Sequence, residues 1–338
     1  MKRRIWALGA LGLAVGLGIP FAIGGGATLS RLQELPAGIW LVALGMIALA
    51  WNANAVRLRL LLGGIGRPMK QAQAVGTVMA TEFAICATPA GAGGPVTLVM
   101  LLKRHGLSAA QGIALYAIDQ LMDMLFFVTA LVAMGLYWLL IPSRVDAVWQ
   151  LAPLAGLLGA GLLAVVLLTR FHRGALLAAL FLLRKLHVKR RRRRRLVRAV
   201  AEFRRGLNLV GGFSKSRLLG VYAVCVVHWL LRYSVLYVVI RALGLRIGWA
   251  WSFLVQMLSL TVGQFTFLPG GSGGAELSAT ALLTPSLGAA YAAAAVLAWR
   301  FATYHWYLIA GAPMFAMQAG RWRLARAKVA SVPVETRP

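Results

Sequence analysis

The chain has 338 residues, of which 60% are hydrophobic and only 13% are charged, with a mean hydropathy of +0.76. This composition excludes an ordinary soluble domain, in which about a quarter of the residues are charged. The net charge of +28 could indicate nucleic-acid binding, but Lys and Arg also accumulate in the cytoplasmic loops of membrane proteins. No aromatic-rich binding module surrounds the basic run Lys189–Arg195, so we expect it to contact anionic lipid rather than RNA or DNA.

In chain order, six apolar segments are long enough to cross a bilayer, which predicts an all-α integral membrane protein with about six full transmembrane helices. They lie at about residues 5–23, 37–56, 109–140, 151–169, 218–240 and 289–317. The first is longer than the apolar part of a secretory signal peptide and lacks a clear cleavage site, so we expect it to be retained. The two cysteines, Cys86 and Cys225, lie in apolar segments and do not indicate a disulfide framework.

Two further segments, 71–102 and 248–283, are interrupted by proline and glycine. Basic residues flank the first on both sides and few charges surround the second, so each is expected to be a re-entrant helical hairpin. With both termini in the cytoplasm, this topology places 30 Lys and Arg residues inside, four outside and two within spans, which accounts for all 36. The charge distribution therefore favours cytoplasmic termini.

The two interruptions repeat one motif at an offset of 180 residues: Pro89-x-Gly91-x-Gly93-Gly94 recurs as Pro269-x-Gly271-x-Gly273-Gly274. We interpret the chain as a single polytopic membrane domain, 1–338, whose halves, 1–140 and 151–317, form an inverted repeat. The second half contains a basic cytoplasmic loop at 170–217, and a basic cytoplasmic tail follows at 321–338. Paired glycine-rich breaks in inverted halves are typical of transporter binding sites, where half-helix N-termini face an anion near the midplane. Close helix packing is the alternative reason for such glycines.

Only eight acidic residues are present, so those in apolar segments are informative. Asp119 and Asp123 are four residues apart on one helix face, while Glu82 and Glu276 lie beside the two breaks. All four are candidates for proton coupling.

The intramembrane basic residues are His228 and Arg232, which share a helix face, and Arg300 with His305 in the last long segment. Such groups usually pair or line a polar cavity. One alternative is therefore a structural ion pair, for instance of Arg300 with Glu276 or Asp123. No metal-ligand spacing and no catalytic motif is present, so neither a cofactor nor an enzymatic activity is expected.

The stretches PGGSGGAE, WRFATY and TPAGAGG followed by LLKRHGLS resemble the flippase-like transmembrane domain of the lysylphosphatidylglycerol synthases, which also occurs as a stand-alone protein. The resemblance covers nearly the whole chain. It implies a multi-pass protein of a bacterial or archaeal cytoplasmic membrane that moves lipid between leaflets. Pro95 and Gln120 stand where family members commonly have other, often charged, residues. Only a short tail follows the last span, so this chain alone is not expected to synthesise a lysyl-lipid.

The resemblance also implies which residues bind substrate. They are Thr88, Pro89, Gly93, Gly94, Pro269, Gly270, Gly271, Gly273, Gly274, Glu276, Arg300, Thr303 and Tyr304, to which the second glycine-rich run adds Ser272 and the intramembrane charges add Arg232.

The hypothesis is a translocase for a phospholipid or other anionic lipid-linked substrate, bound at the paired glycine-rich tips. The expected partners are that lipid, the bilayer and no nucleic acid. A membrane enzyme acting on lipid-linked phosphate, or a non-transporting partner of a separate lipid-modifying enzyme, are the alternatives.

Overall fold

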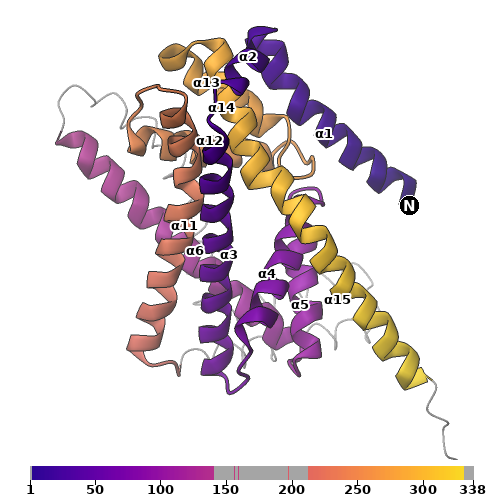
Figure 1. Ribbon diagram of the computed structural model, residues 1–338. Helices are drawn as coiled ribbons and strands as arrows, with labels where there is room; N and C mark the ends of the chain where they lie inside the picture. The colour runs from indigo at the N-terminus through magenta and orange to yellow at the C-terminus, as the bar shows by residue number, and fades with distance from the viewer. Residues whose placement is uncertain (1, 141–155, 157–158, 160–196, 198–211, 331–338) are drawn as a thin grey trace, which may run out of the picture. The chain divides into compact units, whose positions relative to one another are not determined.

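The computed structural model describes residues 2–140 and 212–330, together with the single residues 156, 159 and 197 (Figure 1). Over this part of the chain the regular secondary structure is helical, so the predicted all-α class is confirmed there. The predicted span 151–169, most of the predicted basic loop 170–217 and the tail beyond residue 330 lie outside the described residues.

The helices before residue 140 are α1 (Lys2–Gly24), α2 (Ala27–Gln33), α3 (Ala37–Gly64), α4 (Gln71–Cys86), α5 (Gly93–Arg104) and α6 (Ala109–Leu139). Those after residue 212 are α11 (Lys215–Ala242), α12 (Trp249–Gln264), α13 (Gly274–Leu287), α14 (Ala289–Arg300), a π-helical turn (Phe301–His305) and α15 (Trp306–Ala330).

Three of the described helices, α3, α6 and α11, are long and apolar enough to cross a membrane. The pair α1 and α2 adds a fourth if it counts as one broken span, because the two helices are bent by 103° at a break that contains Gly25, whose φ is 65°. These helices support a membrane protein. The expected total of about six spans, two re-entrant hairpins and an inverted repeat stays a prediction.

The chain forms two compact units. The first comprises residues 1–59, 68–101 and 227–338, and the second comprises residues 60–67 and 102–226. Both proline–glycine breaks belong to the first unit, which therefore contains the candidate site.

Helix α14 is central to the first unit, where α1, α2 and α13 all pack against it (Figure 1). Its run of small side chains, Ala292–Ala295, is fully buried. Small residues let helix backbones approach closely, which stabilises helix association where lipid, not water, surrounds the bundle. The alanine-rich sequence thus positions Arg300, the last residue of α14, inside the packed unit.

In the second unit, α6 begins with a capping box. The Ser108 hydroxyl accepts from the Gln111 N–H at 3.2 Å, and the Ser108 N–H donates to the Gln111 side chain at 2.8 Å. Two N–H groups that the helix leaves without a partner are thereby satisfied. Farther along α6, the Asp123 carboxylate lies 3.4 Å from the Cys225 thiol.

Candidate functional site

The first break, between α4 and α5, is a pair of overlapping turns. The Gly91 N–H donates to the Thr88 carbonyl and the Ala92 N–H donates to the Pro89 carbonyl, both at 3.2 Å. Ala90 and Gly91 have positive φ values of 48° and 69°. Proline followed by a residue of positive φ is the pattern of a type II turn. Ala90 therefore holds a conformation that side-chain-bearing residues rarely adopt.

The second break, between α12 and α13, has the same pair of turns. The Gly271 N–H donates to the Leu268 carbonyl at 3.0 Å, and the Ser272 N–H donates to the Pro269 carbonyl at 3.3 Å. Gly270 and Gly271 have φ values of 63° and 67°. Glycine thus stands at both positive-φ positions, where it adopts this conformation without steric cost.

The two breaks lie side by side, because Pro89 and Pro269 form an antiparallel bridge. The two turn hydrogen bonds and the two positive-φ positions of one break recur 180 residues away in the other. The second helix after each break, α6 and α14 respectively, also begins at an equivalent position, at Ala109 and Ala289, 180 residues apart. The proximity of the two tips agrees with the expectation from the motif offset, whereas their depth and direction in a membrane stay predictions.

At the first tip, the predicted site residue Thr88 caps α5. Its hydroxyl accepts from the Gly93 N–H at 2.8 Å and donates to the Ala84 carbonyl at 2.6 Å. A Cβ on Gly93 would lie 2.7 Å from the same carbonyl oxygen, and one on Gly94 would overlap the Ile85 side chain. These glycines allow the start of α5 to approach the end of α4.

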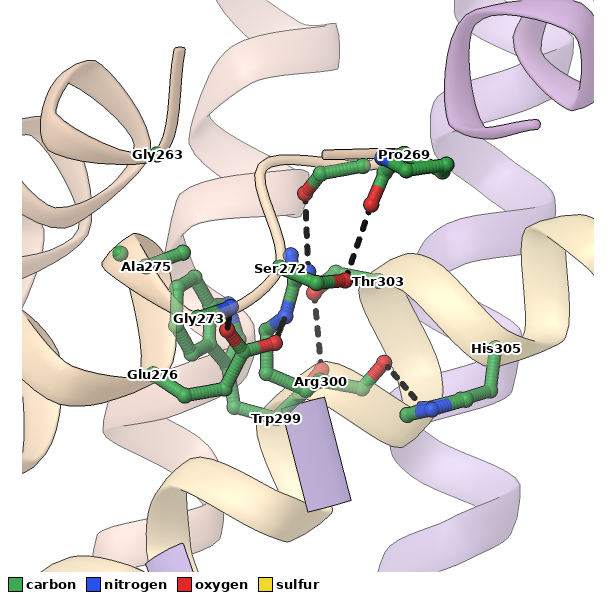
Figure 2. A network of polar contacts seen from close by, with 12 residues as sticks. Gly263, Pro269, Ser272, Gly273, Ala275, Glu276, Trp299, Arg300, Thr303 and His305 are labelled. Carbon is green, nitrogen blue, oxygen red and sulfur yellow. Dashed lines mark hydrogen bonds and ion pairs between the residues drawn. The ribbon is translucent and has the colours of Figure 1, made fainter. Parts of the chain in front are cut away.

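At the second tip, the Glu276 carboxylate is enclosed by donors (Figure 2). One oxygen accepts from the Gly273 N–H at 2.7 Å, and the other accepts from Arg300 Nε at 2.6 Å. Arg300 Nη2 also donates to the Gly270 carbonyl at 2.8 Å. Glu276 is fully buried and Arg300 is 2% exposed. The acid thus occupies the N-terminus of α13, the end of a helix that attracts negative charge, and Arg300 is held by the protein in an ion pair.

The Tyr304 ring supports this network. The Arg300 guanidinium lies 4.5 Å from the ring centroid, and a Cβ on Gly270 would collide with the ring atoms. The π-helical turn that carries Tyr304 begins directly after Arg300, and the His305 ring nitrogen Nδ1 lies 3.2 Å from the Arg300 carbonyl oxygen (Figure 2). Single π-helical turns occur frequently at functional sites. Here the turn places the Tyr304 ring against Gly270 at the second tip.

Helix α1 covers the second tip through two glycines four residues apart. A Cβ on Gly16 would lie 3.2 Å from Glu276 Oε1, and a Cβ on Gly12 would lie 3.4 Å from the Pro269 ring. Small residues at this spacing permit close helix contacts in membranes. The first apolar segment is therefore a structural part of the unit that encloses the buried acid.

We expect Gly16→Leu to lower the thermal stability of the detergent-purified protein, because the new side chain must displace Glu276 or push α1 away. Overpacking of this kind typically costs about 1–3 kcal/mol. Gly18→Leu is the matched control, since among the described residues no atom lies within 4 Å of a Cβ at Gly18 in the same helix. Equal melting temperatures for the two variants would show that α1 does not cover the tip.

A second acid–arginine pair lies in the same unit. Arg232 Nη1 and Glu82 Oε2 are 3.5 Å apart, with side chains 16% and 9% exposed. The Arg232 guanidinium also lies 4.8 Å from the ring centroid of Tyr307 and 5.5 Å from that of Trp229. This pair is looser than that of Glu276 with Arg300.

A family model described as the lysylphosphatidylglycerol synthase TM region matches residues 9–311, which include both breaks and both ion pairs. The chain belongs to this family. A curated relative, a UPF0104 membrane protein of Archaeoglobus fulgidus, is 24% identical over 270 residues, covering 78% of this chain and 81% of the relative. The resemblance to lysylphosphatidylglycerol synthases expected from the sequence is thus confirmed at the level of the family.

In this member of the lysylphosphatidylglycerol synthase TM region family, the first unit contains most of the predicted site residues. Thr303 is buried there, and its hydroxyl donates to the Trp299 carbonyl at 2.8 Å within the helix. His228 is also buried in this unit, with Nδ1 2.9 Å from the Ala50 carbonyl oxygen. The other two proton-coupling candidates, Asp119 and Asp123, belong to the second unit.

Four residues beside the pairs were missed by sequence reasoning. Gly12 and Gly16 were detectable from their four-residue spacing in an apolar helix, which is a known helix-packing motif. Trp51 and Tyr307, which meet edge to face with centroids 5.0 Å apart, had no such signal. They come from α3 and α15, and only the folded chain brings them together.

Proposed function

We propose that this membrane protein translocates a phospholipid or other anionic lipid-linked substrate between leaflets. The observation that carries the proposal is the pair of matched proline–glycine turns joined at Pro89 and Pro269. Paired broken helices from two halves of a chain are typical of transporter substrate sites. The chain belongs to a family described as the transmembrane region of lysylphosphatidylglycerol synthases, which supports a lipid as the substrate class.

The two acid–arginine pairs, one buried and one partly buried, add a second argument. Charged groups inside a membrane protein are costly, and a bundle held together by apolar contacts alone needs none of them. In the proposed cycle, the headgroup lies against the two tips while the acyl chains stay in the bilayer. Protonation of Glu276 would weaken its hold on Arg300 and on the Gly273 N–H, so that these donors can face an anion. Glu82, Asp119 and Asp123 are the other candidates for this coupling.

The proposal includes the membrane arrangement expected from the charges. The two broken segments are re-entrant hairpins of an inverted repeat, the termini are cytoplasmic, and the membrane is the cytoplasmic membrane of a bacterium or archaeon. Basic residues at the flanks of the helices support this orientation.

Reconstitution tests the proposal directly. The purified chain is inserted into vesicles that contain fluorescent phosphatidylglycerol or phosphatidylcholine, and a membrane-impermeant quencher reports how fast each lipid changes leaflet. We expect protein-dependent exchange that is faster for phosphatidylglycerol than for phosphatidylcholine. Protein-free vesicles are the control. Release of a chemically altered lipid would instead indicate an enzyme, and neither exchange nor product would indicate a partner subunit.

A further inference from the structure

Beside the Glu82–Arg232 pair, two buried polar groups have no hydrogen bond of ordinary geometry to any residue that the structure describes. They are the Trp51 indole N–H and the Tyr307 hydroxyl, on side chains that are 5% and 0% exposed. The two rings are in contact, and the Arg232 guanidinium lies over the Tyr307 ring. Because buried polar groups in proteins are nearly always hydrogen-bonded, such a pair requires an explanation.

Donors outnumber acceptors in this cluster. The guanidinium carries five N–H donors and no acceptor, and the indole only donates. Even where the indole N–H points at the tyrosine oxygen, the tyrosine proton still needs an acceptor. The carboxylate that faces Arg232 is Glu82, at 3.5 Å, which is longer than the usual charge-assisted hydrogen bond of about 2.7–2.9 Å.

The Glu276–Arg300 pair differs from the Glu82–Arg232 pair in how fully protein groups satisfy its hydrogen bonds, and this difference indicates what the second pair is suited to bind. Arg300 lies 2.6 Å from Glu276 and also donates to a backbone carbonyl, while Glu276 accepts from a backbone N–H. Protein groups thus supply the hydrogen-bond partners of that pair. At Arg232 the carboxylate is more distant, and the neighbouring Trp51 N–H and Tyr307 O–H make no hydrogen bond of ordinary geometry to the described residues.

We infer that Arg232, Trp51 and Tyr307 form an anion-binding site, with Glu82 as the internal carboxylate that a bound oxyanion displaces. The ligand chemistry is that of a phosphate oxygen, whether in a lipid phosphodiester or in inorganic phosphate. Arginine with neutral N–H and O–H donors is well matched to such oxygens. Binding itself does not depend on the proposed function. Assigning the phosphate to a transported lipid does rest on it.

The test is a calorimetric titration of the full chain in detergent, with short-chain phosphatidylglycerol, inorganic phosphate and short-chain diacylglycerol as probes. Tyr307→Phe removes the hydroxyl and keeps the ring, and Trp51→Phe removes the indole N–H and keeps an aromatic, though smaller, ring. We expect each variant to bind phosphatidylglycerol about tenfold more weakly, as for loss of a hydrogen bond to a charged group. Glu82→Gln removes the competing charge and is expected to bind more tightly.

Tyr291→Phe is the matched control, because its hydroxyl donates to Glu34 at 3.1 Å in an exposed position of the same unit. Affinity within twofold of the unchanged chain for both Tyr307→Phe and Trp51→Phe would overturn the inference, as would weaker binding by Glu82→Gln. Should Tyr307→Phe fail to fold, Trp51→Phe decides alone. Equal binding of diacylglycerol would show that the acyl chains, not the anion, are recognised.

The remaining arms identify the source of the phosphate and separate this site from transport. Binding of inorganic phosphate as tight as that of phosphatidylglycerol indicates a small-anion site, and binding of the lipid alone indicates a headgroup site. Both results support the anion chemistry. Anion binding by a chain that moves no lipid in vesicles contradicts only the proposed function. If the chain exchanges lipid in vesicles but binds anions equally well after Tyr307→Phe and Trp51→Phe, only this inference is contradicted.

Discussion

Arg300→Gln is expected to destabilise the protein by about 3–5 kcal/mol, because it leaves the Glu276 carboxylate buried without its ionic partner. Glu276→Gln leaves the buried Arg300 guanidinium without its ionic partner, so we expect it to destabilise the protein by a similar amount. The double variant should recover part of the loss, since neither charge is then left alone. Unfolding by heat and by denaturing detergent measures each effect.

The chain supplies a control pair with nearly the same geometry. Arg31 and Glu34 are 2.5 Å apart, but both side chains are 40% exposed. Exposed ion pairs contribute little to stability because water and salt screen them. Arg31→Gln should therefore leave the melting temperature almost unchanged. If Arg300→Gln abolishes lipid exchange while the protein remains as stable as the unchanged chain, Arg300 serves the substrate rather than the fold.

Gly270→Ala is the second change with a large expected effect. The left-handed backbone at φ 63° costs about 1–2 kcal/mol for a residue with a side chain, and the new methyl group collides with the Tyr304 ring. Overpacking adds about 1–3 kcal/mol. We therefore expect a marked loss of both stability and lipid exchange, measured by thermal unfolding and by the vesicle assay.

Two variants separate the backbone cost of Gly270→Ala from the cost of its collision with Tyr304. Gly25→Ala carries a comparable backbone cost at φ 65°, but no atom of the described residues lies within 4 Å of its Cβ, so the collision is absent. Ala90→Gly, at the equivalent position of the first tip, should raise stability by up to about 1 kcal/mol, since glycine relieves the strain at φ 48°. A stabilising Gly270→Ala would mean that the second tip does not have the turn described here.

The positions of both breaks could be predicted from the sequence because the relevant signal is local. Proline followed by glycine at fixed spacing determines where a helix must stop, and the 180-residue offset paired the two motifs. The partners of the arginines were less accessible. Glu276 was one of two candidates for Arg300, since charge alone does not choose between acids on different helices.

The contacts of Trp51 and Tyr307 were beyond sequence reasoning for a different reason. Trp51 lies in the apolar helix α3 and Tyr307 in the apolar first part of α15, so composition does not distinguish them from ordinary lipid-facing or core positions. The π-helical turn after Arg300 was also missed, because the alanine-rich stretch before it continues a normal helical pattern. Each depends on packing between segments far apart in the chain.

The docking of α1 on the second tip also has a consequence for biosynthesis. Gly16 is synthesised some 260 residues before its neighbour Glu276, which at about 5–20 residues per second is an interval of roughly 10–50 s. During that time the face of α1 that carries Gly12 and Gly16 lacks the second tip, against which it packs in the folded protein. A chaperone or insertase that shields this helix during translation is therefore expected to improve the yield of folded protein.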